Sequence, residues 1–432
     1  MNTAFPFLTA YDPPGTSEGT LDPLGLYQIA DQLAVQLVPA VRERMQRIRF
    51  VTAMAVGALV TEGLEDDPRN RDASPYLVWE WLVVEALLRT DGDDRRLWGV
   101  PGTVVGRRAL KQYGYLDARS YLKTPRIFGF HAVYKRLATH LGLVNVHLEP
   151  GPNTEGLVHA WARGLGLSGF REAKSLLGEL SAAVRRSLKE KPPRTNPGWG
   201  ARGWDELAKA FNPPMSKAQE KRYLRNLLLA SNERRLGALP AIWELQAGFS
   251  DDKFSEEALH SRLKKQEPRY RPLLEAIRAY ETFARGLQDA FDVLKAEAAG
   301  WDTQGYEVQK IARDPDFKSS VKSLHLKFES AHRALGDAAL PNLALQNQFD
   351  RQFAAFAVPL PAAECALAIC THHVVIQKAK SADGKRPWFD RLGHDRIYIR
   401  HAYREPRREI QPGRYVHDYR GRPIRRFYED LT

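Results

Sequence analysis

Two cysteines and two histidines lie close together in the last fifth of the sequence and have the chemistry to hold zinc. Cys365 and Cys370 are followed by His372 and His373. On a helix, Cys365 and His372 are one heptad apart, whereas Cys370 and His373 lie on a different face. Structural zinc sites take their ligands from a knuckle or from two elements. We therefore predict cysteines buried on a core helix and no metal.

Other catalytic patterns are weak or missing. The glycine-rich run at 164–169 has dinucleotide-loop spacing, but residues 157–163 before it have a helical pattern, not the strand that this motif requires. Acid clusters at 65–67 and 91–94 occur in turn-like stretches typical of solvated loops. No phosphate loop, nucleophile elbow or His-Glu-x-x-His motif occurs. We therefore expect that the protein is not an enzyme and binds no cofactor. A divergent nuclease is the least favoured of the three functions considered.

Lysine and arginine form the strongest chemical signal. The net charge is +12, and residues 95–136 contain ten Lys and Arg against one acid. About six to ten phosphate contacts give strong, salt-dependent DNA binding. The alternative is an ordinary solvated basic face. The candidate DNA-contacting residues of this block are Arg107, Arg108, Lys111, Arg119, Lys123, Arg126, His131, Lys135 and Arg136.

Two further regions are basic. Residues 185–225 include a Pro-rich stretch and are interpreted as a linker between helices. From 378 onward, cations are interleaved with aromatic residues, a mixture that suits single-stranded nucleic acid or a protein interface equally well. The candidate contact residues of this set are Lys378, Lys380, Lys385, Arg386, Trp388, Arg400 and Arg404.

The elements around the first basic block predict a winged helix. Apolar spacing indicates a helix over 104–113, a turn at Gly114, a short helix at 117–122 and a helix over 126–141 that ends at Gly142. An alternating strand pattern follows at 143–148. In such a module the last helix presents its N-terminal half to the major groove.

The rest of the chain predicts a mainly α fold. It would be a multidomain helical protein with the winged-helix-like module inside it and a small, basic α+β module at its C-terminal end. Two 3.5-residue seams, at 273–294 and 317–335, predict a pair of long antiparallel helices. The expected domains are a helical domain (1–94), the winged-helix-like module (95–164), a basic helical linker region (165–232), a helical bundle (233–360) and the C-terminal module (361–432).

Two cysteines five residues apart cannot form a disulfide framework, which suits a reducing cytoplasm. The sequence has no run of about 18 apolar residues and no signal-peptide pattern. We therefore expect a cytoplasmic protein without a membrane partner.

Several terminal stretches resemble uncharacterised helical proteins of bacterial phage-defence gene clusters. They are FLTAYDPP at 7–14, LDPLG at 21–25, HH at 372–373, QKAK at 377–380 and GKRPWF at 384–389. Such clusters also encode helicases and nucleases. The resemblance implies an accessory subunit that contacts DNA or a partner enzyme, and it assigns no functional residues.

These observations together predict a non-enzymatic, DNA-binding accessory or sensing subunit of an anti-phage defence system. Double-stranded DNA is favoured over single-stranded DNA as the partner because the basic block coincides with the helix-turn-helix outline. The alternative is a protein-protein adaptor that assembles a helicase or nuclease complex through the helical pair and the aromatic C-terminal set.

Overall fold

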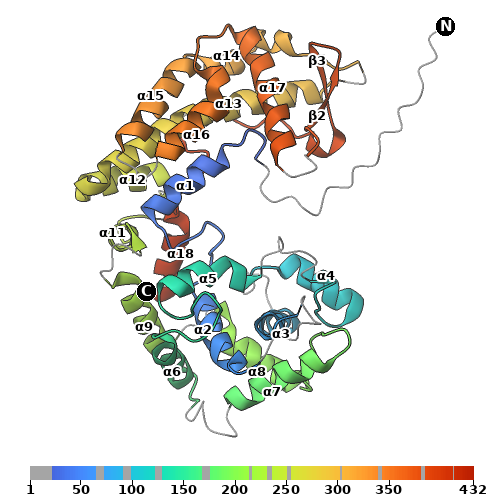
Figure 1. Cartoon of the computed structure of the whole chain (residues 1–432), viewed down its shortest axis with the longest axis vertical. Coiled ribbons are helices and arrows are strands. Elements are labelled where there is room, and N and C mark those ends of the chain that lie inside the picture. Colours follow the sequence, from blue (N-terminus) through green and yellow to red (C-terminus); the bar gives the residue numbers. More distant parts are fainter. Residues whose placement is uncertain are drawn as a thin grey trace, which may run out of the picture. The chain divides into compact units, whose positions relative to one another are not determined.

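The computed structural model of the whole chain is mainly helical, with one small sheet (Figure 1). It describes residues 22–64, 73–90, 99–121, 129–167, 176–213, 217–230, 236–250, 254–301, 304–338, 343–380, 385–411 and 413–432.

The chain forms two compact units, and each combines segments that are distant in sequence. Unit 1 contains the residues up to Leu33 together with Arg269–His417. Unit 2 contains Ala34–Pro268 together with Asp418–Thr432. Helix α1 (Tyr27–Leu37) includes the first boundary between them.

Unit 2 is a helical domain built around α2 and α3, which are apolar on nearly every face and therefore buried. Ser74 and Pro75 begin α3: the Ser74 hydroxyl accepts the Leu77 N–H at 3.3 Å, and a proline is well suited to the first helical position. Figure 1 shows α3 end-on, with α2, α4 and α7 around it. The helices of unit 2 are α2 (Arg49–Thr61), α3 (Pro75–Arg89), α4 (Thr103–Tyr113), α5 (Phe130–His140), α6 (Thr154–Gly164), α7 (Leu176–Lys189), α8 (Ala201–Phe211), α9 (Ala218–Leu229), α11 (Leu239–Gln246), α12 (Glu256–Gln266) and α18 (Gly421–Leu431).

The core of unit 2 contains a fully buried ion pair. Arg49 of α2 pairs with Glu220 of α9, and both side chains are fully buried. Thr52 donates to the same carboxylate at 2.6 Å, and the Arg49 guanidinium also donates to the Ala210 carbonyl at 2.7 Å. These hydrogen bonds help to offset the cost of burying the two charges, and the Arg49 Nε is left without a partner among the described residues.

We predict that Glu220→Gln destabilises the protein by about 3–5 kcal/mol, because it leaves the buried Arg49 charge without a counter-charge. Chemical denaturation measures this loss. The matched control is Glu206→Gln, which removes an exposed pair with Arg202 and should cost less than about 1 kcal/mol. Equal losses in the two variants would contradict the role assigned to burial.

A second buried acid lies where α12 meets the start of α18. The Glu256 carboxylate accepts the Arg422 N–H at 3.3 Å, and its other oxygen lies 3.6 Å from Nε2 of His260. Burial, with a smaller contribution from Asp418, raises the pKa of Glu256 to about 8. Burial lowers the pKa of His260 to about 3. Both side chains are therefore neutral in the folded protein at pH 7.

We predict a pH dependence of stability that Glu256→Gln removes. The folded protein holds the Glu256 proton more tightly than the unfolded chain does, so this stabilisation is complete below the ordinary pKa of 4.5 and is lost as the pH rises toward 8. The His260 contribution runs the other way, and it is complete above pH 6.5. Between pH 6.5 and 8 the native protein should lose up to about 1.4 kcal/mol per pH unit relative to the variant. If the free energy of unfolding changed with pH in the same way for the native protein and for Glu256→Gln across this range, the raised pKa of Glu256 would be refuted.

Unit 1 packs around the 29-residue helix α13 (Arg271–Ala299). Helix α13 contacts α14 and α15, and Phe283 anchors a cluster of rings with Phe328, Phe349 and Phe353 at centroid distances of 5.2–5.9 Å. The remaining elements of unit 1 are β1 (Tyr306–Glu307), α14 (Pro315–Val321), α15 (Leu324–Asp337), α16 (Leu343–Phe353), α17 (Ala362–Ala379), β2 (Phe389–Leu392) and β3 (Arg396–Ile399), with 3-10 helices at Val308–Arg313, Ala354–Phe356 and His401–Tyr403.

The second predicted seam is not one helix. The chain breaks at Lys322 and Ser323 into α14 and α15, and Ser323 has a left-handed φ of 54°. The prediction of a single helix over 317–335 is therefore wrong. The seam survives the break because Phe317, Leu324 and Phe328 are all buried.

The C-terminal part of unit 1 contains a three-stranded antiparallel sheet in the order β1-β3-β2. Tyr306 pairs with Ile397, and Phe389 pairs with Ile399. Residues Arg396–Ile399, which form β3, alternate between exposed or half-buried and buried positions. Ile397 and Ile399 are buried, and these alternating positions fasten the sheet to α13.

Candidate nucleic-acid interface

Helix α4 carries the most exposed part of the first basic block. It ends at Gly114, as predicted, with a left-handed φ of 77°. Of its residues only Gly106 and Ala109 are buried, and a Cβ at Gly106 would lie 2.6 Å from Leu88 of α3. This close approach seats one narrow side of α4 on α3. The opposite side faces outward with Val104, Arg107, Arg108 and Lys111, and Tyr113 is exposed at the end of the helix.

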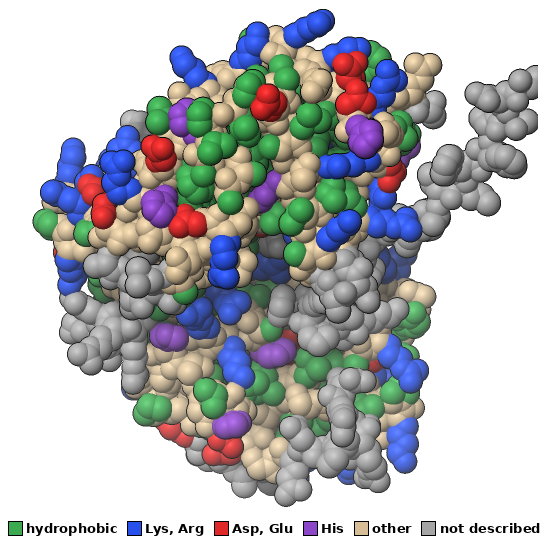
Figure 2. Space-filling view, turned by 45° about the horizontal axis from the view of Figure 1, so that its top comes forward, with side chains coloured by type: hydrophobic (Ala, Val, Ile, Leu, Met, Phe, Trp, Pro, Cys, Tyr) green, Lys and Arg blue, Asp and Glu red, His purple; other side chains and the backbone are tan. Residues whose placement is uncertain are grey.

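Three exposed cations on and beside α4 form no ion pair with any residue that the structure describes. Figure 2 shows Lys and Arg scattered over a whole face of the molecule, so exposure alone does not identify a binding surface. Within the described residues, however, the exposed Arg108, Lys111 and Arg119 form no ion pair. The acid of this stretch, Asp117, is buried, and its carboxylate accepts the N–H groups of Arg119 and Ser120 at 3.0 and 2.6 Å.

The first two basic regions meet at one surface of unit 2. Asp117 and Arg194 form an antiparallel bridge, and the Thr195 N–H donates to the Leu116 carbonyl at 2.9 Å. The Arg194 guanidinium lies 4.7 Å from the centre of the Tyr115 ring. We call this set the α4 surface: Arg107, Arg108, Lys111, Tyr113, Tyr115, Arg119 and Arg194.

Three members of the α4 surface are not among the residues predicted from the sequence: Tyr113, Tyr115 and Arg194. Tyr113 is 49% exposed, and its ring lies 6.1 Å from that of Tyr115. Arg194 was placed in a linker, although the basic Pro-rich stretch that contains it was the available signal. Arg194 also pairs with Glu190 at 2.8 Å, so it is partly neutralised.

A buried carboxylate holds this junction in place. Glu85 of α3 accepts a hydrogen bond from the Thr195 hydroxyl, and the Leu116 N–H donates to the same hydroxyl oxygen at 2.9 Å. Arg89 donates to the other Glu85 oxygen at 2.7 Å. Burial raises the pKa of Glu85, while the hydrogen bonds from Thr195 and Arg89 oppose that shift. The loops that carry Arg119 and Arg194 are thereby fixed to one core helix.

Helix α5, the predicted groove-reading helix, is anchored instead of exposed. Every residue of α5 is at least partly buried, and its apolar side packs on α2. His131 donates its backbone N–H to Glu80 at 2.7 Å, and its ring lies 2.6 Å from the same carboxylate. Burial alone would lower the pKa of His131, but Glu80 raises it. Lys135 and Arg136 are half-buried, while Lys123 and Arg126 lie outside the described residues.

The prediction of a strand at 143–148 is wrong. These residues form a turn with a single bridge between Val144 and Pro150. The Asn145 side chain accepts the N–H groups of His147 and Glu149 at 2.8 and 3.0 Å. An Asx turn of this kind takes the donors that a strand would give to a partner. Residues 143–150 therefore form no wing strand beside α5.

The aromatic residues of the C-terminal set are packed inside unit 1. Trp388 is 8% exposed and stacks on Tyr403 at 4.8 Å, while Phe389 is 2% exposed. The backbone N–H of Trp388 donates to Nε2 of His373 at 2.9 Å. Bases could not stack on these rings without unfolding the sheet.

Most cations of the same set have partners within the protein. Lys380 donates to the Asp22 carbonyl, and Arg400 pairs with Asp390 at 2.7 Å. Arg404 lies over the Tyr398 ring at 4.9 Å. Lys385 is half-buried and also makes contacts, whereas Lys378 and Arg386 are exposed. The structure thus does not gather these seven residues into one cationic surface.

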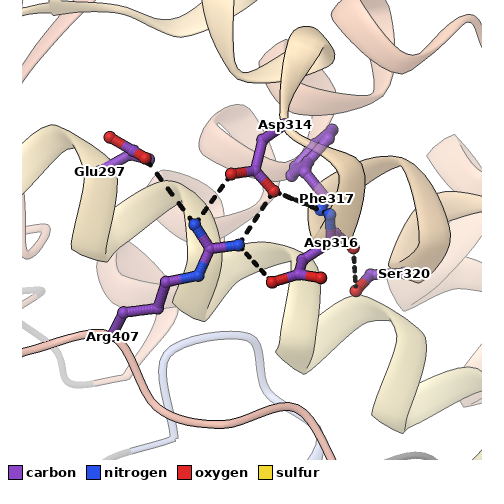
Figure 3. Close-up of polar contacts among 6 residues, drawn as sticks. All are labelled: Glu297, Asp314, Asp316, Phe317, Ser320 and Arg407. Atoms are coloured by element: carbon purple, nitrogen blue, oxygen red, sulfur yellow. Dashed lines mark hydrogen bonds and ion pairs between the residues drawn. The ribbon is translucent and has the colours of Figure 1, made fainter.

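The neighbouring Arg407 ties the segment after β3 to α14 (Figure 3). Its guanidinium contacts both oxygens of Asp314 at 2.8 and 3.0 Å, Asp316 at 2.5 Å and Glu297 at 3.7 Å. Asp314 also accepts the Phe317 N–H at 3.0 Å and so caps α14. Burial alone would raise the pKa of Asp314, but the hydrogen bonds from Arg407 lower it.

The cysteines and histidines of α17 are structural. Both cysteines are buried thiols. His373 donates through Nδ1 to the Pro23 carbonyl at 2.9 Å, and His372 donates through Nε2 to the Leu24 carbonyl at the same distance. Across the part of the chain that the structure describes, no three His, Cys, Asp or Glu residues form a metal-binding group. The acid clusters at 65–67 and 91–94 lie outside that part.

The chain matches no protein-family model, and no curated protein or solved structure resembles it significantly. Among the described residues, no helix is both long and apolar enough to cross a membrane.

We predict that Arg407→Ala loosens the segment around it, because three carboxylates then lose their shared cation. Hydrogen exchange of residues 404–411 should speed up. Arg408→Ala is the matched control, since Arg408 is 70% exposed and pairs only peripherally with Glu405. Similar exchange in the two variants would contradict the anchoring role of Arg407.

Proposed function

We propose that this protein binds nucleic acid, double-stranded DNA in the first place, through the α4 surface. The observation that supports this is the set of exposed cations Arg108, Lys111 and Arg119, which form no ion pair among the described residues, where the nearby acid Asp117 is buried. A surface of this kind releases counterions when it neutralises phosphates. The function is the one that the sequence favours, but the contact helix is α4 instead of α5.

The spacing on α4 suits a helix that lies along phosphates. Val104, Arg107, Arg108 and Lys111 fall three or four residues apart and share one side of the helix. Tyr113 and Tyr115 at its end provide ring faces and hydroxyls that can contact sugar or phosphate. In an anti-phage system, as the resemblance implies, such a subunit would supply DNA contact to a helicase or nuclease partner.

A protein partner is the second candidate, and one observation favours it. Val104 is 71% exposed on the same side of α4 as the cations. An exposed apolar residue beside Arg and Tyr is typical of the core of a protein interface. An adaptor of this kind would bind nucleic acid weakly by itself.

We predict that Arg108→Glu combined with Lys111→Glu weakens binding to a DNA duplex at least about tenfold at low salt. The slope of log affinity against log salt should become shallower by about two, since two phosphate contacts are lost. Electrophoretic shift or anisotropy titrations at several salt concentrations measure both quantities.

The matched control is Arg222→Glu with Arg225→Glu. These residues are also exposed and unpaired, and they lie on α9, on the other side of unit 2 from α4 in Figure 1. The control should retain most of the affinity. Unchanged binding in the α4 variant, or an equal loss in the control, would overturn the proposal and leave the adaptor as the better account.

A further inference from the structure

Unit 1 contains a cavity of about 360 Å³ that none of the preceding roles uses. It lies between the end of α14, the start of α15, the chain that follows the 3-10 helix Ala354–Phe356, and the first turn of α17. Its volume is in the range of small-molecule sites. The break of the seam helix at Lys322 and Ser323 lies at this cavity, and both residues line it.

The floor of the cavity is apolar and neutral. Leu324, Phe356 and Cys365 line it and are each less than 5% exposed. Burial raises the pKa of the Cys365 thiol to about 12, so this side chain carries no charge at pH 7. Val358 also lines the cavity and is 57% exposed, which leaves apolar surface open to a ligand.

The rim is cationic. Lys318 and Lys322 are exposed, His325 is half-buried, and none of the three forms an ion pair with a described residue. No Asp or Glu is among the described residues that line the cavity. The start of α15 adds to this polarity, because its N-cap residue Ser323 makes no side-chain cap hydrogen bond.

We propose that this cavity binds a small amphipathic carboxylate, with its alkyl or aryl chain against Leu324, Phe356 and Val358 and its carboxylate between Lys318 and Lys322. The apolar chain contributes about 0.8 kcal/mol for each buried CH₂ group. The anionic end selects the ligand, because a cationic head group would meet only like charge at the rim. The inference does not depend on nucleic-acid binding, since the α4 surface belongs to unit 2.

Isothermal titration calorimetry of the full chain tests this assignment with three ligands that share one chain length: octanoate, octanamide and octylammonium. Octanoate should bind with a dissociation constant near or below about 1 mM, and the other two at least about tenfold more weakly. Equal binding of all three ligands would show that only the alkyl chain is recognised and would overturn the proposal. Absence of octanoate binding at several millimolar would overturn it too.

Variants then locate the site. Lys318→Gln with Lys322→Gln should weaken octanoate binding about tenfold, whereas Lys378→Gln with Arg386→Gln, also exposed residues of unit 1, should not change it. Because all four side chains are exposed, the variants should keep their melting temperatures. Lys322→Glu should shift the preference from octanoate toward octylammonium. Retention of octanoate binding in the Lys318 and Lys322 double variant would place the ligand elsewhere and refute the site.

Discussion

The proposed binding surface depends on the hydrogen bonds that the buried carboxylate of Glu85 accepts. A carboxylate inside a helical core must be given donors, and here they come from Arg89 and from Thr195, a residue of a distant loop. Thr195 in turn holds Leu116, so two loops that carry cations converge on one helix. The positions of the exposed cations Arg119 and Arg194 thus depend on the buried carboxylate of Glu85.

The same device recurs across both units. Glu80 holds the start of α5 through His131, and Gly129 is required there because a Cβ would lie 1.4 Å from the carboxylate. In unit 1, Glu281 of α13 accepts the ring N–H of His417 at 2.7 Å and also binds the Val416 N–H. Buried acids on core helices therefore fix the segments that pack over them, while the helix faces themselves supply the hydrophobic stabilisation.

Local signals made part of this structure predictable. Helix α4 and its end at Gly114, the Ser74 cap and strand β3 all follow from patterns that act over a few residues. The turn at 143–148 was not predicted, since its alternating residues suit a strand and the side chain of Asn145 decides the outcome. The contacts of Trp388 and Arg400 were not predictable from the sequence either. Whether an aromatic or a cation faces water depends on residues far away in sequence, such as Phe291, which lies 5.8 Å from Trp388.

The arrangement of the chain in two units constrains the order in which the protein can fold during synthesis. Unit 2 needs α18, which comes from the last fifteen residues, and unit 1 needs both the residues up to Leu33 and the chain as far as His417. The chain must therefore leave the ribosome at least as far as His417 before either unit can close its core. Until then, the apolar helices α2 and α3 are exposed to chaperones and to other nascent chains for longer than they would be in a protein with contiguous domains.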